Sequence, residues 1–307
     1  PQAFGEWAEA SGKRFGYQVQ VWEEEQIKEA GLHALLAVGG ASHRRPIFIK
    51  AHYRPEGLPE GAPRVTLVGK GVTFDTGGIS IKPSQNMHFM KTDMGGAAMS
   101  LGTLEAAARL QLPIEINVVV CSCENSVSAT AIKPGDVIDT LSGQTIEVLN
   151  TDAEGRLILA DGLYYAVQDT HPDYLINLAT LTGSVVRTLG YDYAGLFSKN
   201  EKLIADLQKA SEQSGDGVWR LPINDNHADE LSSDVADLKN ISHRPLAGAS
   251  VAAKFLEYFT DNHPAWAHLD VAGTSFGNTP FSKEKNATGY GINLLITFLE
   301  NLIAENA

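Results

Sequence analysis

Apolar residues along the chain alternate between short continuous runs and longer stretches with helical spacing. Residues 64–68 are predicted to be a strongly buried strand, and the apolar run 114–121 is typical of a central strand buried on both faces of a sheet. Shorter patterns predict further strands at residues 17–22, 45–52, 174–179 and 266–271, and a hairpin over 137–149. Apolar positions three and four apart predict helices over residues 4–15, 23–30, 95–110, 156–166, 201–214, 248–259 and 290–300.

The order of these elements predicts the fold class. Strands that alternate with helices favour an α/β fold, with a mostly parallel sheet covered by helices on both faces. No internal repeat or linker interrupts the pattern, so we expect one domain over residues 1–307. Two stretches lack a regular pattern. The glycine-rich segment 69–78 is predicted to be a loop, and the long polar segment 224–246 a functional loop or rim.

The amino-acid composition limits the kinds of partner that the protein is expected to bind. Hydrophobic residues make up 43% of the chain, enough for a substantial core. The 24 basic and 37 acidic residues give a formal charge of −13, which argues against nucleic acid because phosphate contacts need a basic face. No signal-peptide pattern or apolar run of bilayer length is visible, so no membrane partner is expected. Cys121 and Cys123 are interpreted as reduced packing thiols, in keeping with a cytoplasmic location.

Charged residues gather in three clusters that follow predicted strands. Ligand sites in open α/β sheets lie at the carboxyl ends of strands, so these clusters are expected to converge. The densest is the segment 150–156, which packs two carboxylates and an arginine between a β-rich segment and an apolar helix. The first cluster holds Lys70, Asp75 and Lys82, the second Asp93 within residues 90–96, and the third Asp152, Glu154 and Arg156.

Four carboxylates in one pocket would repel one another unless cations neutralise them. Four Asp or Glu side chains with one neutral donor can hold a pair of divalent metals about 3.5–4 Å apart. Because no histidine shows metal-ligand spacing, this oxygen-rich set suits zinc, manganese, magnesium or cobalt rather than a structural zinc site. Two such metals could share a water, lower its pKa and direct it at a carbonyl. The alternative is that Asp75, Asp93 and Asp152 only cap helices or turns.

These clusters resemble the leucine aminopeptidase family of dinuclear zinc or manganese metallopeptidases, which includes cytosol aminopeptidase and bacterial aminopeptidase A and peptidase B. Residues 150–157 (NTDAEGRL) match the family signature in full, and residues 68–82 (VGKGVTFDTGGISIK) and 91–98 (KTDMGGAA) match its other metal-binding segments. The likeness continues through residues 179–183, 266–273 and 287–289, so it covers nearly the whole chain. Residues 125–131 depart from the family pattern, which affects subsite detail rather than chemistry.

The resemblance implies a three-layer α/β/α catalytic domain with a mixed, mostly parallel central sheet, as in zinc exopeptidases. It also implies that the family's smaller N-terminal domain is absent from this chain, and that the protein is a homohexamer. Position by position, one metal would be bound by Lys70, Asp75, Asp93 and Glu154, and a more exchangeable metal by Asp75, Asp152 and Glu154. Lys70 is a demanding ligand because its reference pKa is about 10.4. The alternative for Lys70 is an ion pair with Asp75 or Asp93.

Lys82 and Arg156 match the family's catalytic residues that bind no metal. The resemblance implies that Lys82 donates to the substrate carbonyl and the developing oxyanion, a role worth about 10²–10³-fold in comparable donors. It implies that Arg156 holds a bicarbonate ion that acts as general base. The alternatives are a solvated Lys82 and an ion pair of Arg156 with Asp152 or Glu154.

The same resemblance implies an aminopeptidase that removes one residue from short peptides. The free amine would bind the exchangeable metal, and Met90, Thr180 and Gly183 would shape the pocket for the first side chain. A methionine there suits Leu or Met substrates, although Met90 could equally be a core residue. His268 is interpreted as a core histidine rather than a ligand.

Two other functions compete with this hypothesis. A dinuclear phosphoesterase would also use two metals to clamp its substrate, but the lack of histidine ligands weighs against it. A non-catalytic oligomeric scaffold would keep its function after its metal ligands were neutralised, and the acidic charge argues against a DNA-binding version of it.

Overall fold

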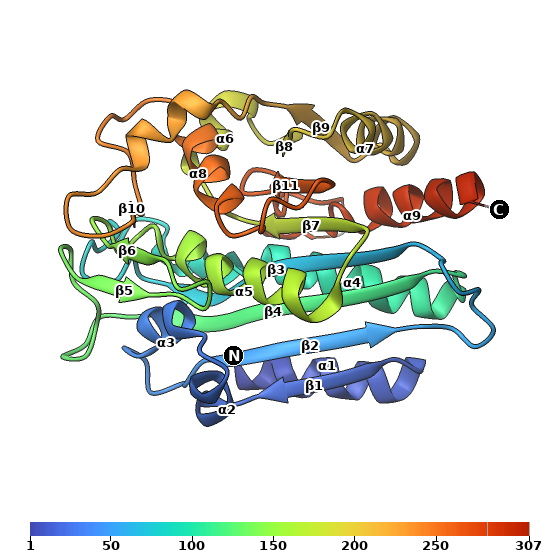
Figure 1. Ribbon diagram of the computed structural model, residues 1–307, viewed down its shortest axis with the longest axis horizontal. Helices are drawn as coiled ribbons and strands as arrows, with labels where there is room; N and C mark the ends of the chain where they lie inside the picture. Colours follow the sequence, from blue (N-terminus) through green and yellow to red (C-terminus); the bar gives the residue numbers. More distant parts are fainter. Residues whose placement is uncertain (281, 307) are drawn as a thin grey trace.

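Eight strands form one mixed sheet through the middle of the molecule, in the order β1-β2-β4-β3-β7-β11-β8-β9 (Figure 1). The structure is a computed structural model that describes residues 1–280 and 282–306. The strands of this sheet are β1 (Gln18–Trp22), β2 (Ile47–Tyr53), β3 (Arg64–Asp75), β4 (Glu115–Asn125), β7 (Tyr174–Ala179), β8 (Tyr193–Ser198), β9 (Gly217–Arg220) and β11 (Trp266–Asp270).

The four central strands of the sheet are parallel. Strand β3 pairs in parallel with β4 and β7, and β7 pairs in parallel with β11. Strands β1 and β2 are antiparallel at one edge, and β8 is antiparallel to β11 near the other. The mixed, mostly parallel sheet predicted from the sequence is therefore confirmed. Its central parallel strands bring their carboxyl ends to one edge, at the left of Figure 1 where the arrow of β7 points.

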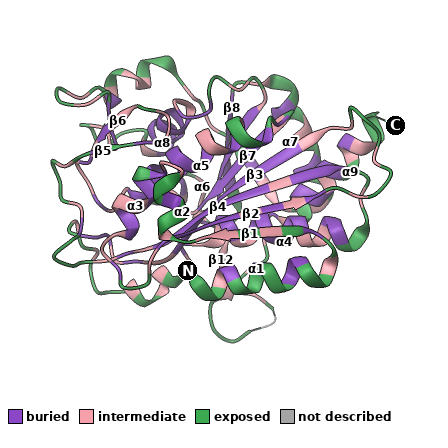
Figure 2. Ribbon diagram, turned by 60° about the horizontal axis from the view of Figure 1, so that its bottom comes forward, coloured by how far each residue is buried: buried purple, intermediate pink, exposed green. Residues whose placement is uncertain are grey.

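Helices cover both faces of the sheet, which confirms the three-layer α/β/α arrangement. One face packs against α1, α4, α7 and α9, and the other against α2, α3, α5 and α8. The outward sides of these helices are exposed while the strands between them are buried (Figure 2). The helices are α1 (Gln2–Phe15), α2 (Glu24–Glu29), α3 (His33–Gly39), α4 (Gly95–Leu110), α5 (Glu154–Thr170), α6 (Gly183–Leu189), α7 (Glu201–Ser214), α8 (Gly248–Glu257) and α9 (Ile292–Asn306).

Strand β7 explains why the central strands have continuous apolar sequences. Successive side chains of a strand point to opposite faces of the sheet. Accordingly, Leu175 and Ala179 pack in the core under α5 and α8, whereas Ile176 and Leu178 pack in the core under α4 and α9. A strand covered on both faces buries every side chain, so the pattern shows no polar alternation.

The segment 69–78 was predicted to be a loop, and that prediction is wrong for residues 69–75. Strand β3 continues to Asp75, because the Gly69–Val72 stretch pairs with β4 as regularly as the apolar residues before it. Glycine at position 69 serves packing, since a Cβ there would lie 2.5 Å from the Cα of Ala97 in α4. As a result, Lys70 and Asp75 are held by a central strand.

Helix α5 starts at Glu154, two residues before the predicted start, so Glu154 and Arg156 lie in its first turn. Helices α3 and α6 and strands β8 and β9 were not predicted from the sequence. Helices α3 and α6 have only seven residues each, too short for a helical pattern to stand out.

The remaining strands are short and lie near the carboxyl edge. Strands β5 (Val137–Asp139) and β6 (Thr145–Glu147) form the predicted hairpin, and β10 (Leu238–Lys239) pairs with β6. The polar segment 224–246 contains only β10 and two short 3-10 turns, so its irregular character is confirmed. Strands β12 (Phe276–Gly277) and β13 (Asn286–Ala287) form a separate small hairpin.

Cys121 and Cys123 are both buried and free, as predicted. In the described ranges, no helix combines the length and apolar composition needed to cross a membrane.

Candidate metal centre

Three buried carboxylates meet at the carboxyl edge of the sheet. They come from the end of β3 (Asp75), from the residue after the 3-10 turn Met87–Thr92 (Asp93), and from the first turn of α5 (Glu154). One oxygen of each lies within 4.8 Å of the others, and all three side chains are buried. The structure thus brings together residues from all three predicted clusters.

Two lysines sit among these carboxylates. Lys70 Nζ lies 2.7 Å from Asp93 Oδ2 and 2.9 Å from Glu154 Oε1, and it also donates to the main-chain oxygen of Thr180 at 3.0 Å. Lys82 Nζ lies 2.8 Å from Asp75 Oδ2 and 2.5 Å from Asp152 Oδ1. Asp152 therefore joins the cluster through Lys82, and Lys82 is not the solvated lysine of the alternative interpretation.

The electrostatics of the cluster reflect its burial. Burial raises the pKa of Glu154 and of Asp93, although Lys70 opposes the shift in both cases. Burial alone would lower the pKa of Lys70, but Asp93, Glu154 and Asp75 together raise it above its ordinary value. The carboxylate Oε2 of Glu154 is buried and has no hydrogen-bond partner among the described residues. Four carboxylates thus share two ammonium groups, and one buried acceptor is left over.

This donor set fits divalent metal ions. Four carboxylates face only two ammonium groups, and Glu154 Oε2 has no partner among the described residues. A further cation would balance this buried negative charge. The oxygen-rich surroundings suit a hard or borderline metal. The ammonium of Lys70 lies between Asp93 and Glu154, so ligation by Lys70 would require a metal to displace its proton.

Glycines let the backbone approach this cluster. Gly155, in the first turn of α5, faces Lys70, and a Cβ there would lie 2.6 Å from Lys70 Cε. Gly77 has a φ of +87°, and its Cβ position is 2.8 Å from Asp152 Oδ1. Gly96, by contrast, serves packing of α4, since its Cβ would lie 1.9 Å from the main-chain oxygen of Leu178.

Arg156 is buried near the cluster but does not bond to it. Its Nη1 donates to the main-chain oxygen of Asn240 at 2.6 Å, and among the described residues no carboxylate pairs with it. Burial lowers the pKa of Arg156 to about 10, against the pull of Glu154 and Asp270. The ion pair of Arg156 with Asp152 or Glu154, the alternative from the sequence, is not formed.

Two asparagines that the sequence analysis missed hold the segment 150–156 in place. Asn240 accepts from the main-chain N–H groups of Leu149 and Asn150, and it donates to the oxygen of Asn150. Asn125, at the end of β4, donates through one amide to Asp75 Oδ1 at 2.8 Å and to the oxygen of Thr151 at 3.0 Å. Asn240 lies in the predicted functional segment 224–246, and Asn125 lies in the segment 125–131 that departs from the family pattern, but neither segment indicated the asparagine itself.

A cavity of about 310 Å³ opens over the cluster. All three residues predicted to shape a substrate pocket, Met90, Thr180 and Gly183, line it. Met90 is half-buried, so it is a wall residue rather than a core residue. His268 is fully buried on β11 and bonds to Asn177, with its pKa lowered by burial to about 3, as expected of a core histidine.

Fold and site together define an α/β/α protein with an acidic, multi-carboxylate metal site at the carboxyl edge of its sheet. Comparison of its sequence with known proteins identifies its family. The chain belongs to the cytosol aminopeptidase family, since the model of that family's catalytic domain matches residues 1–296. This confirms the resemblance seen in the motifs.

Curated relatives agree with this assignment. The probable cytosol aminopeptidase of Chlorobaculum parvum is 50% identical over 294 residues, which cover 96% of this chain and 58% of the relative. That of Rickettsia bellii is 45% identical over 302 residues, covering 98% of this chain and 60% of the relative. A solved structure, the bottromycin maturation enzyme BotP in complex with Mn, is 37% identical with a TM-score of 0.92, covering 99% of this chain and 66% of that one. The chain thus spans less than two thirds of the length of these relatives.

Proposed function

We propose that this chain is the catalytic part of a metal-dependent aminopeptidase that releases N-terminal residues from short peptides. The observation that carries the proposal is the buried trio of Asp75, Asp93 and Glu154, with oxygens within 4.8 Å of one another, in a chain of this family. The structural similarity to BotP, which was solved in complex with Mn, supports metal binding by this fold. On this proposal residues 1–307 form a single catalytic domain.

Five residues would hold two divalent metals, zinc or manganese, with magnesium or cobalt as further options. Lys70, Asp75, Asp93 and Glu154 would bind one metal, and Asp75, Asp152 and Glu154 the exchangeable one. Bound metals would supply Lewis acidity that makes a water nucleophilic near neutral pH and polarises the scissile carbonyl. Asn125 supports this arrangement, since its amide fixes one oxygen of Asp75 and leaves Oδ2 facing Lys82.

Lys82 and Arg156 would act on the substrate and on the base. Lys82 is 21% exposed and points its ammonium into the cavity between Asp75 and Asp152. It would donate to the carbonyl oxygen as negative charge develops there. Arg156, with no carboxylate partner of its own, would hold a bicarbonate ion that takes a proton from the attacking water.

The cavity suits the amino end of a peptide. Its carboxylates would attract the free amine, so only a terminal residue can reach the reactive position. Met90, Thr180 and Gly183 would surround the first side chain, and the apolar Val186 and Ala272 line the same cavity. This lining favours Leu or Met as the first residue. We further propose a cytoplasmic protein that assembles as a homohexamer, with no nucleic-acid or membrane partner.

Hydrolysis of leucine p-nitroanilide by metal-loaded protein tests this function. We expect turnover that follows metal content, and its loss in the double variant Asp152→Asn/Glu154→Gln. The matched control is Glu212→Gln, which neutralises an exposed carboxylate on α7 and should leave the rate unchanged. Turnover of p-nitrophenyl phosphate, with none across a panel of aminoacyl substrates and metals, would instead favour the phosphoesterase hypothesis.

A further inference from the structure

A second cavity, of about 340 Å³, adjoins the one over the carboxylate cluster. Both are lined by Asp152, Leu181, Thr182 and Gly183, so they meet along the loop that precedes α6. The far side of the second cavity is formed by α6, by the start of α8 and by residues 241–245. A ligand that fills the first cavity can therefore extend into the second.

The two cavities differ sharply in charge. The first is lined by four carboxylates and two lysines. The second is lined by three arginines, Arg156, Arg187 and Arg244, and its one acidic residue is the shared Asp152, which already pairs with Lys82. In a protein with a formal charge of −13, such a concentration of guanidinium groups is a specific local feature.

Arg187 stands out because it lacks an internal partner. Within the described part of the chain, the arginines outside this cavity are either paired with a carboxylate or, for Arg14, stacked on an aromatic ring. Arg187 has neither kind of partner, and it is exposed on α6. Its Nη1 lies 3.5 Å from the Cβ position of Gly183, so the guanidinium folds back to the junction of the two cavities.

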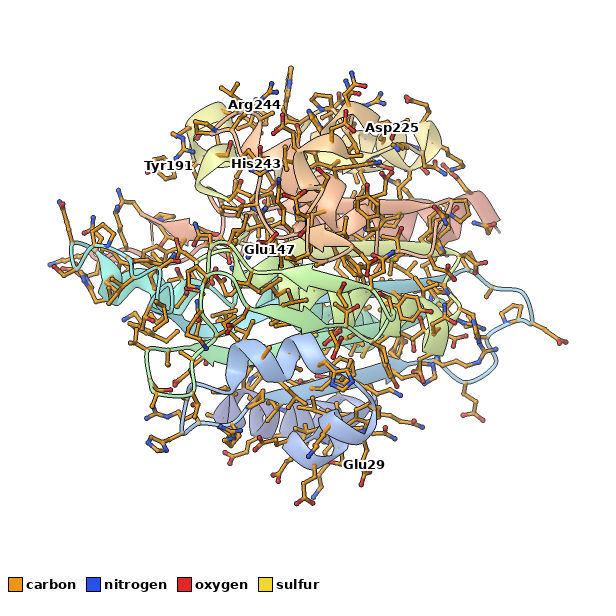
Figure 3. The ribbon with its side chains drawn as sticks, turned by 60° about the vertical axis from the view of Figure 1, so that its left-hand side comes forward. Glu29, Glu147, Tyr191, Asp225, His243 and Arg244 are labelled. Atoms are coloured by element: carbon orange, nitrogen blue, oxygen red, sulfur yellow. The ribbon has the colours of Figure 1, made fainter. Side chains whose placement is uncertain are left out.

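Arg244 is nearly as free. Across residues 1–280 and 282–306, its only carboxylate contact is with Glu230 at 3.5 Å, and its side chain is 72% exposed. Figure 3 shows Arg244 at the outer surface of this end of the molecule. A flexible arginine at the rim can turn toward an anion in the cavity at little cost, because the ion pair it gives up is solvent-exposed and weak.

We propose that Arg187 and Arg244 form a carboxylate-binding subsite for the part of a peptide beyond the scissile bond. The proposal rests on the aminopeptidase function above, since it assumes that the free amine lies among the carboxylates of the first cavity. A peptide with its amine there and a carboxylate one or two residues later matches the charges of both cavities. The substrate class is therefore short peptides with a nearby carboxylate, either a C-terminus or an Asp or Glu side chain.

Kinetics with paired substrates test the subsite and separate the two carboxylate sources. Leu-Gly is compared with Leu-Gly-amide, and Leu-Asp-amide with Leu-Asn-amide, in the metal-loaded protein. We expect the member with the carboxylate to have kcat/KM higher by about tenfold, mostly through a lower KM, as is reasonable for a partly exposed charge-assisted contact. In Arg187→Gln/Arg244→Gln this preference should disappear, while Leu-Gly-amide turnover stays within about twofold of the original.

Matched variants show whether the preference for a substrate carboxylate depends on Arg187 and Arg244 in particular. Arg14→Gln removes an exposed arginine on α1 and should leave the preference intact. Arg187→Lys keeps the charge but loses the planar fork, so a reduced preference is expected. Equal kcat/KM for both members of each pair in the original protein, or a preference unchanged in the double glutamine variant, would overturn the proposal.

Calorimetric binding of an uncleavable ligand separates this proposal from the proposed function. The reduced analogue of Leu-Gly, with CH₂–NH in place of the peptide group, keeps both amine and carboxylate and does not depend on turnover. Binding about tenfold tighter than that of its carboxamide, lost in the double glutamine variant, supports the subsite even if no peptide is hydrolysed. Equal affinities contradict the subsite even if hydrolysis proceeds.

Discussion

Buried carboxylates in this fold are of two kinds, and the two kinds are satisfied in different ways. Asp270, at the end of β11, accepts from the main-chain N–H groups of Leu181, Thr182 and Ala272 and from the Thr182 hydroxyl at 2.7 Å. Glu154, in the first turn of α5, has one oxygen 2.9 Å from Lys70 and the other with no partner. Both are fully buried.

Asp161, like Asp270, is satisfied by main-chain N–H groups. It accepts from the N–H of Leu35 at 3.0 Å and from the N–H of Leu141 at 2.9 Å, and so ties α3 and the β5–β6 hairpin to α5. Such carboxylates replace water with fixed backbone dipoles, and their surroundings are complete without a ligand. The carboxylates of the candidate metal centre depend on mobile charged side chains, and their surroundings are incomplete. The difference separates residues that stabilise the fold from residues suited to bind a cation.

The largest expected effect comes from Glu154→Gln. We expect kcat/KM for leucine p-nitroanilide to fall by at least about 10³-fold, because changes outside a metal's ligand set already cost about 10–100-fold. The free energy of unfolding of the metal-free protein should not fall, since burial raises the pKa of Glu154 and a neutral side chain is better tolerated there. Kinetics and urea unfolding measure these two quantities, and metal analysis shows which samples carry metal. A destabilised variant that keeps full activity would erase the distinction between the two kinds of carboxylate.

Asp161→Ala should show the opposite pattern. It leaves the N–H groups of Leu35 and Leu141 without an acceptor, so we expect a loss of about 2–4 kcal/mol in the free energy of unfolding. Activity per folded molecule and metal content should stay unchanged. Urea unfolding beside Asp139→Ala, which removes an exposed carboxylate on β5, provides the comparison. Loss of metal content without loss of stability would show that Asp161 belongs instead with the carboxylates of the candidate metal centre.

Added metal should stabilise the folded protein only through the carboxylates of the candidate metal centre. A ligand at about 100 times its dissociation constant stabilises the folded state by about 2.7 kcal/mol. We expect an increment of this size in the original protein and in Asp161→Ala, and none in Glu154→Gln. Thermal unfolding with manganese or zinc, before and after a chelator, measures it. An equal increment in all three proteins would mean that the metal binds elsewhere.

The sequence predicted which residues gather at the site better than how they are held. Asp75 lies at the end of a strand, and Asp93 and Glu154 lie just before or at the start of a helix. These places all meet at the carboxyl edge of the sheet, so the convergence of the three side chains follows from the topology. The strand conformation of Lys70 could not be predicted, because the glycines around it are typical of loops and only their pairing with β4 and contact with α4 show otherwise.

Residues that act through the main chain left no signal of their own in the sequence, beyond lying in segments already singled out. Asn240 and Asn125 hold the segment 150–156 and Asp75 through bonds to residues that are 26 to 90 positions away. The partner of Arg156 is likewise a main-chain oxygen, 84 positions away. Such contacts depend on tertiary packing, and no local pattern of residue types predicts them. By contrast, the exposed arginines of the second cavity were visible in the sequence but lay outside every motif.

The smallest expected effect belongs to Asp225, an exposed carboxylate that has more cationic partners than any of the buried ones compared above. Asp225 Oδ1 lies 2.8 Å from Lys199 and 2.9 Å from Lys254 at the outer surface (Figure 3). These lysines lower the pKa of Asp225 from 3.8 to about 2, so the stabilisation is present above pH 3.8 and is lost as the pH falls toward 2. Because water and salt screen the pair, we expect Asp225→Asn to lower the urea midpoint only slightly at pH 7, less in 1 M NaCl, and not at all near pH 2. A loss at pH 7 as large as that of Asp161→Ala would show that the number of partners, rather than burial and partner type, determines what a carboxylate contributes to this fold.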